Sequence, residues 1–119
     1  MGRLTTHVLD TSSGQPAGGL KVELFVVSDT GPVATPIVSA NTNADGRVDG
    51  PLLEGGSFSN GTYELRFHVA EYFRSQGVTL PDPPFLDIVP IRFGISDTSA
   101  HYHVPLLISP YGYSTYRGS

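Results

Sequence analysis

Alternating hydrophobic and polar residues fill most of this chain, and their period of two predicts β-strands. The clearest alternation covers residues 63–69, where aromatic and aliphatic side chains at odd positions alternate with Glu64, Arg66 and His68. The same analysis predicts further strands at residues 3–10, 20–27, 37–43, 89–95, 101–108 and 113–117. Residues 70–77 are expected to form the one short helix, closed by Gly77. About eight short strands with turns between them indicate an antiparallel sandwich or barrel.

The segments between the predicted strands are rich in turn-forming residues. Asn43-Ala44-Asp45-Gly46 is expected to be a tight turn in which Gly46 takes a positive φ, and Arg47 follows directly at the rim of the hairpin. Pro90 indicates a sheet edge or bulge, because proline cannot donate to a ladder. Residues 50–61 are interpreted as a connecting loop.

Composition narrows the class of protein. A chain of 119 residues is the length of one domain, so residues 1–119 are expected to share one core. No apolar run approaches the roughly 20 residues of a membrane span, and no secretory signal opens the chain, so a cytoplasmic protein is expected. The net charge is −4 and the seven basic residues are scattered, which argues against a nucleic-acid partner. The absence of cysteine excludes disulfides and thiolate chemistry.

No residue that could take part in catalysis or ligand binding indicates a specific function when it is considered alone. His101 and His103 project to one face of a strand and could handle protons or bind metal, or they could be half-exposed surface histidines. No third zinc ligand lies nearby in sequence, so no metal is expected. His7 and Arg47 each have an ordinary structural interpretation, and Ser114 lacks the surroundings of a nucleophilic serine.

Taken together, several motifs resemble the 5-hydroxyisourate hydrolases, the transthyretin-related proteins. Tyr116-Arg117-Gly118-Ser119 resembles the signature tetrapeptide of that family, and the residues from Ser109 to Thr115 resemble the block before it. The remaining motifs are Thr6-His7-Val8-Leu9-Asp10 with Gly14-Gln15-Pro16-Ala17, Asn43-Ala44-Asp45-Gly46-Arg47, and His101-Tyr102-His103-Val104-Pro105-Leu106-Leu107. The resemblance covers the whole chain.

The resemblance implies an all-β, eight-stranded Greek-key sandwich of the transthyretin type, with one short helix, that assembles as a homotetramer, a dimer of dimers. It implies hydrolysis of 5-hydroxyisourate in urate degradation, with no cofactor. His7, Arg47 and His103 correspond to the catalytic trio, and His101 is expected near the rim. The residues expected to bind substrate are Tyr116, Ser114, Arg117, Gly118 and Ser119.

Two other functions stay open at this point. A transthyretin-like carrier could bind a small aromatic ligand in the same channel without converting it, although small or aliphatic groups would then be expected where this chain has His103 and Tyr116. A non-catalytic adhesion sandwich is compatible with the fold alone. Grouping His7, Arg47 and His103 in one place would be costly without a function.

Overall fold

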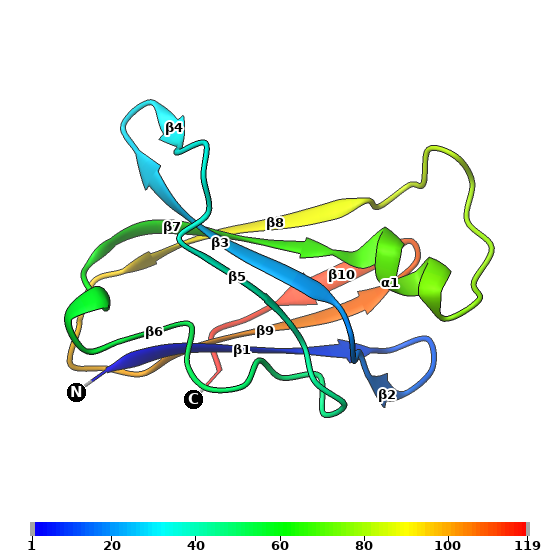
Figure 1. Cartoon of the computed structure of the whole chain (residues 1–119), viewed down its shortest axis with the longest axis horizontal. Helices are drawn as coiled ribbons and strands as arrows, with labels where there is room; N and C mark the ends of the chain where they lie inside the picture. The colour runs from blue at the N-terminus through cyan, green and yellow to red at the C-terminus, as the bar shows by residue number, and fades with distance from the viewer. Residues whose placement is uncertain (1, 119) are drawn as a thin grey trace.

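The computed structural model describes residues 2–118, which fold into two β-sheets packed face to face (Figure 1). The elements in chain order are β1 (Arg3–Asp10), β2 (Gln15–Pro16), β3 (Lys21–Ser28), β4 (Gly31–Pro32), β5 (Val38–Asn41), β6 (Leu53–Glu54), the 3₁₀ turn η1 (Gly55–Ser57), β7 (Gly61–His68), α1 (Val69–Ser75), β8 (Ile88–Ile95), β9 (Tyr102–Ser109) and β10 (Gly112–Thr115). The two-residue strands β2 and β4 extend the hairpins that start from β1 and β3. Seven of the remaining strands lie in the segments predicted to be strands, and β6 lies in the predicted loop; the all-β class with one short α-helix is confirmed.

One sheet has the strand order β10-β9-β1-β2 with β6 on β1, and the other has β4-β3-β7-β8 with β5 on β3. β8 pairs only with β7, so Pro90 lies on an edge strand as predicted. One pair of strands departs from the expected antiparallel pattern: β1 and β9 run parallel from Leu4↔Tyr102 to Asp10↔Ile108. Parallel neighbours need a long crossover connection, and here the whole second sheet lies between them in sequence.

Alternation along the strands decides which side chains enter the core. In β1, Leu4 and Val8 are fully buried against the opposite sheet, while Arg3, Thr5 and His7 point outward. The segment predicted as a simple loop, residues 50–61, also contributes to the core through Leu52, Leu53 and Phe58, and part of it pairs with β1 as β6. Two paired residues are too few to show a period in the sequence.

The predicted closure of α1 by Gly77 is confirmed. Gly77 has φ +82°, its N–H donates to the Arg74 carbonyl at 3.0 Å, and the Val78 N–H donates to the Phe73 carbonyl at 3.0 Å. This pair of bonds is a Schellman motif, which satisfies carbonyls that the helix end leaves free. None of the helices in residues 2–118 is long and apolar enough to cross a membrane.

A buried hydrogen bond ties α1 to the end of β1. The Tyr72 hydroxyl donates to the Asp10 carboxylate at 2.9 Å, and the Ser12 hydroxyl donates to the same carboxylate at 2.6 Å. Burial opposes ionisation of Asp10, but the hydrogen bonds from Ser12, Tyr72 and Ser13 outweigh it and lower the Asp10 pKa. Burial and the Asp10 carboxylate together raise the pKa of Tyr72 to about 12. Asp10 is therefore a satisfied structural carboxylate.

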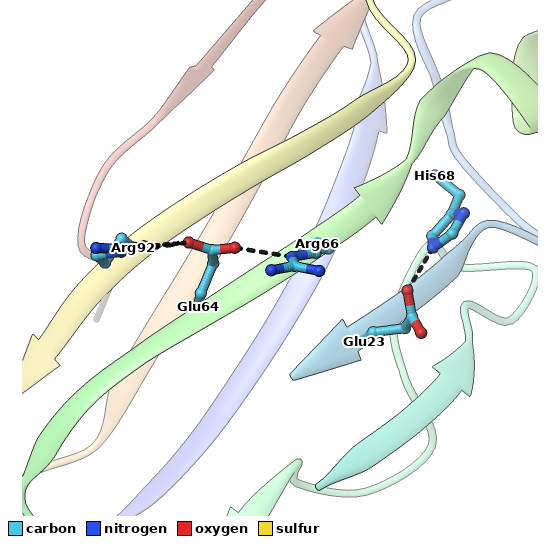
Figure 2. A network of polar contacts seen from close by, with 5 residues as sticks. All are labelled: Glu23, Glu64, Arg66, His68 and Arg92. Carbon is cyan, nitrogen blue, oxygen red and sulfur yellow. Dashed lines mark hydrogen bonds and ion pairs between the residues drawn. The ribbon is translucent and has the colours of Figure 1, made fainter. Parts of the chain in front are cut away.

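Charged side chains cover the outer face of the second sheet, where Glu64 lies between two arginines (Figure 2). Its carboxylate accepts hydrogen bonds from Arg66 at 2.8 Å and Arg92 at 3.2 Å. On the same face His68 lies 2.6 Å from Glu23, as Figure 2 also shows. These contacts provide partners for the charged side chains on the polar face that the alternation in residues 63–69 predicted. They lie on the other sheet from His7 and His103.

Candidate active site

The outer face of the β1–β9 pair carries a hollow of about 480 Å³. Its lining residues are Arg3, Thr5, His7, Arg47, His101, His103, Tyr116 and Gly118. Two are arginines, three are histidines, and no described carboxylate lines it. Such a lining suits carbonyl oxygens and negative charge that develops during a reaction.

The parallel register places the two central histidines together. Thr5 lies opposite His103 in the ladder, and His7 lies two residues further along the same face of β1. His7 Nδ1 is 2.6 Å from His103 Nε2, which is a hydrogen bond between the two imidazoles. Residues 96 positions apart in sequence thus form one unit.

Arg47 reaches this site because the hairpin before it turns back onto β1. Gly46 has φ +74°, as predicted, and its carbonyl accepts a hydrogen bond from the Val8 N–H at 2.8 Å. A Cβ at Gly46 would collide with the Val8 carbonyl, so only glycine permits this approach. The Asn43 side-chain oxygen accepts from the Arg47 N–H at 3.2 Å, and His7 and Arg47 form an isolated β-bridge.

Both central histidines are held in the neutral form. Burial lowers the pKa of His7 below its ordinary value of 6.5, and the charge of Arg47 lowers it further. Burial, then His7, then Arg47 lower the pKa of His103 in the same direction. A neutral imidazole is the form that can accept a proton from water. The site therefore keeps its bases available at neutral pH.

The last described residues approach His103 without continuing the strand. The sequence predicted a strand over residues 113–117, but β10 ends at Thr115. Gly118 returns to β9, where its N–H donates to the His103 carbonyl at 2.8 Å. Tyr116 lies on the wall of the hollow and is 58% exposed.

Two of the predicted substrate-binding residues lie away from the hollow in the single chain. The Arg117 guanidinium lies 4.1 Å from the centre of the Tyr102 ring and donates to the His101 carbonyl at 3.1 Å. Ser114 lies on β10 and lines a separate shallow hollow beside Thr11 and Leu107. Ser119 lies outside the described residues, so its predicted role has no structural counterpart here.

Sequence reasoning missed Thr5 and Arg3, which also line the hollow, and it placed His101 only near the rim. His101 is exposed and belongs to the lining. The period-two parity that puts Arg3, Thr5 and His7 on one face was available in the sequence and could have identified the first two. Within residues 2–118 no group of three or more histidine, cysteine or acidic side chains is placed to hold a metal ion.

The fold and this hollow define a β-sandwich protein whose hydrogen-bonded, neutral imidazoles and neighbouring arginine are suited to acid–base chemistry on a polar substrate. The chain belongs to the HIUase/transthyretin family, whose profile matches residues 4–118.

Individual relatives agree with this membership. The 5-hydroxyisourate hydrolase 2 of Rhizobium meliloti is 64% identical over 118 residues, which cover 99% of this chain and 97% of the relative. The crystal structure of an (S)-allantoin synthase superposes with a TM-score of 0.91 at 47% identity, covering 99% of this chain but only 44% of that longer chain. Sea bream transthyretin in complex with thyroxine superposes with a TM-score of 0.84 at 28% identity, covering 98% of this chain and 94% of transthyretin.

Proposed function

We propose that this chain hydrolyses the ring amide of 5-hydroxyisourate in urate degradation, and that His7, Arg47 and His103 carry the reaction. The observation that carries the proposal is the hydrogen bond between His7 and His103 beside Arg47, in a chain 64% identical to a 5-hydroxyisourate hydrolase. The product is 2-oxo-4-hydroxy-4-carboxy-5-ureidoimidazoline. The reaction needs no cofactor.

The chemistry requires three things from the protein. A water must lose a proton as it attacks the ring carbonyl, the resulting oxyanion must be stabilised, and the departing nitrogen must gain a proton when its bond to carbon breaks. The imidazole pair takes the proton from water and returns it to the nitrogen, so the net change is addition of one water molecule. Arg47 faces the oxyanion with a permanent charge and a fork of N–H donors.

Two of the remaining predicted residues shape the pocket around these groups. Tyr116 forms part of its wall and Gly118 packs against His103. Arg117 contributes to the site only indirectly, through its contacts with the Tyr102 ring and the His101 carbonyl. Substrate-binding roles for Ser114 and Ser119 stay predictions.

The proposal is tested by generating 5-hydroxyisourate in situ from urate with urate oxidase and following its ultraviolet absorbance. The protein is expected to accelerate the decay well above the spontaneous rate. Decay at the spontaneous rate would favour the carrier, in which ligand binds but is not converted.

We further infer that the chain, as one domain, works as a dimer of dimers. The pocket opens to solvent in the single chain, and aromatic side chains are exposed near the β9–β10 turn, where Phe85 is 71% and Tyr111 is 64% exposed. A second copy would cover such apolar surface and exclude water from the pocket. A particle with the 12.7 kDa mass of one chain in solution would contradict the assembly. The cytoplasmic location stays a prediction.

Activity is expected to fall as the pH drops below the ordinary imidazole range and to stay level above it. Both histidines have a pKa lowered from 6.5 by burial and by neighbouring charge, so they remain neutral at pH 7 and become protonated only under more acidic conditions. Protonation removes the base and adds a positive charge beside Arg47. The measurement is kcat/KM from about pH 5 to about pH 8, with circular dichroism at each pH to confirm folding. Loss of activity with a midpoint above pH 6.5 would contradict the lowered pKa of the pair.

Gly118→Ala is expected to lower kcat by about tenfold or more with little change in thermal stability, because it displaces a positioned catalytic group. A Cβ there would lie 2.7 Å from His103 Cδ2, so the imidazole would have to move. Gly112→Ala is the matched control, since its Cβ would meet nothing closer than the Ser109 hydroxyl at 3.6 Å. Equal activity in both variants would show that the His103 ring does not depend on close packing by Gly118.

A further inference from the structure

Thr5 contacts the imidazole pair from the side opposite His7. Its hydroxyl Oγ1 lies 2.7 Å from His103 Nδ1, which is a hydrogen bond. The parallel ladder makes this contact intrinsic to the fold, because Thr5 and His103 are directly paired between β1 and β9. Thr5 is half-buried.

The contact completes a chain of three groups. Thr5 Oγ1 meets His103 Nδ1, and His103 Nε2 meets His7 Nδ1 at 2.6 Å. The two ring centres are 4.8 Å apart and the planes differ by 17°. This separation is close to the largest that a 2.6 Å nitrogen contact allows, so the rings meet edge to edge, with the contacting nitrogens on the line between their centres. That geometry is the one an N–H to lone-pair hydrogen bond requires.

This row of hydrogen-bonded groups gives the two histidines different positions. Both ring nitrogens of His103 are occupied, one by Thr5 and one by His7. Among residues 2–118, only Nδ1 of His7 has a hydrogen-bond partner, so His7 Nε2 is the imidazole nitrogen that a water or substrate in the hollow can meet. His103 therefore acts through His7.

A neutral imidazole carries one N–H and one lone pair, so the chain has two possible arrangements. In one, His103 Nδ1–H donates to Thr5 Oγ1, His103 Nε2 accepts from His7 Nδ1–H, and His7 Nε2 presents a lone pair. In the other, the Thr5 hydroxyl donates to His103 Nδ1, both hydrogen bonds reverse, and His7 Nε2 carries a proton. The first arrangement provides a base and the second provides an acid.

We propose that Thr5 is a positioning residue whose hydroxyl accepts a hydrogen bond from His103 Nδ1–H. This bond fixes the tautomers of both histidines so that His7 Nε2 is the general base of the hydrolysis. The inference rests on the proposed function and assigns the roles within its histidine pair. The same logic operates where a carboxylate holds a catalytic histidine in one tautomer. A hydroxyl can also reverse its role by rotation, so Thr5 permits the arrangement in which His7 Nε2 returns a proton to the departing nitrogen.

Thr6 provides a matched control. It is the same residue type, one position further along β1, but it faces the interior, where its hydroxyl donates to the Val104 carbonyl at 2.7 Å. Thr6→Val removes a buried hydrogen bond without touching His103. A purely structural effect would therefore appear in both Thr5→Val and Thr6→Val.

The test measures kinetics and histidine tautomers on the full chain. Thr5→Val keeps the shape of the side chain and removes the hydroxyl, and we expect kcat to fall by about tenfold to a hundredfold with KM changed by less than about twofold. Thr5→Ser is expected to restore most of kcat. Thr6→Val is expected to lower the melting temperature without lowering kcat of the folded protein.

Nitrogen-15 chemical shifts of the imidazoles give the second readout. In the unmodified protein we expect protons on His103 Nδ1 and His7 Nδ1 and a lone pair on His7 Nε2, and Thr5→Val should shift His103 away from the Nδ1–H form. A lone pair on His103 Nδ1 in the unmodified protein, or unchanged kcat in Thr5→Val, would overturn the inference. If the unmodified protein accelerates no hydrolysis, the proposed function fails, and the nitrogen shifts still decide whether Thr5 sets the tautomer.

Discussion

Arg47→Ala is expected to lower kcat by about a hundredfold or more, which is the usual loss when a donor to a developing oxyanion is removed. The Arg47 side chain is exposed at the hollow, and its backbone holds the hairpin through the bond from the Asn43 N–H to the Arg47 carbonyl at 2.7 Å. Truncating the side chain leaves that bond in place. The fold should therefore survive while the reaction slows.

The measurement is the rate of 5-hydroxyisourate decay with each variant, together with a thermal melt. Arg74→Ala is the control, because Arg74 is also exposed but bonds the Pro81 carbonyl beside α1 and does not line the hollow. Arg47→Lys keeps the charge and loses the planar fork, so it should recover only part of the activity. Activity of Arg47→Ala close to that of the Arg74→Ala control would remove Arg47 from the mechanism.

Replacing His7 and His103 singly and together is expected to show that they act as one unit. His7→Asn and His103→Asn should each lower kcat by about 10²-fold to 10⁴-fold, the range of general acid–base catalysis. The kcat of the double variant should be only slightly below that of the less active single variant, because residues that share one proton path lose their contribution together. The 2.6 Å contact between the rings is the physical basis of this coupling.

His68→Gln is the control for these histidine variants. His68 bonds Glu23, and both residues lie on the sheet that does not carry the candidate site. Replacing His68 should therefore affect stability and leave kcat unchanged. If the losses of the two single variants multiply in the double variant, His7 and His103 act independently and the shared path is wrong.

Local patterns in the sequence predicted much of the fold. The alternation in residues 63–69 identified β7 and its charged outer face, although the chain already turns into α1 at Val69. Gly46 was correctly predicted to take a positive φ and Gly77 to close the helix, because turn chemistry depends on neighbours along the chain. Arg47 could be singled out as a hairpin-rim residue for the same reason.

Pairing between distant strands was not encoded in any local pattern. The parallel ladder of β1 and β9 brings Thr5 and His7 against His103, and neither strand's alternation reveals its partner or direction. Resemblance to a family supplied His7 and His103 as a pair but not Thr5. Arg117 lies past the end of β10 at Thr115, which alternation could not locate, whereas Ser114 lies within β10 and pairs with Leu107.

The most direct test of the account is turnover of 5-hydroxyisourate in large excess over the protein. With substrate at about a hundred equivalents per chain, the account predicts that the absorbance of 5-hydroxyisourate is lost completely and much faster than in buffer, with the ring-opened carboxylate as product. A rapid change that stops near one equivalent per site would indicate a carrier. That result, or decay at the spontaneous rate, would contradict hydrolysis by the His7, Arg47 and His103 site.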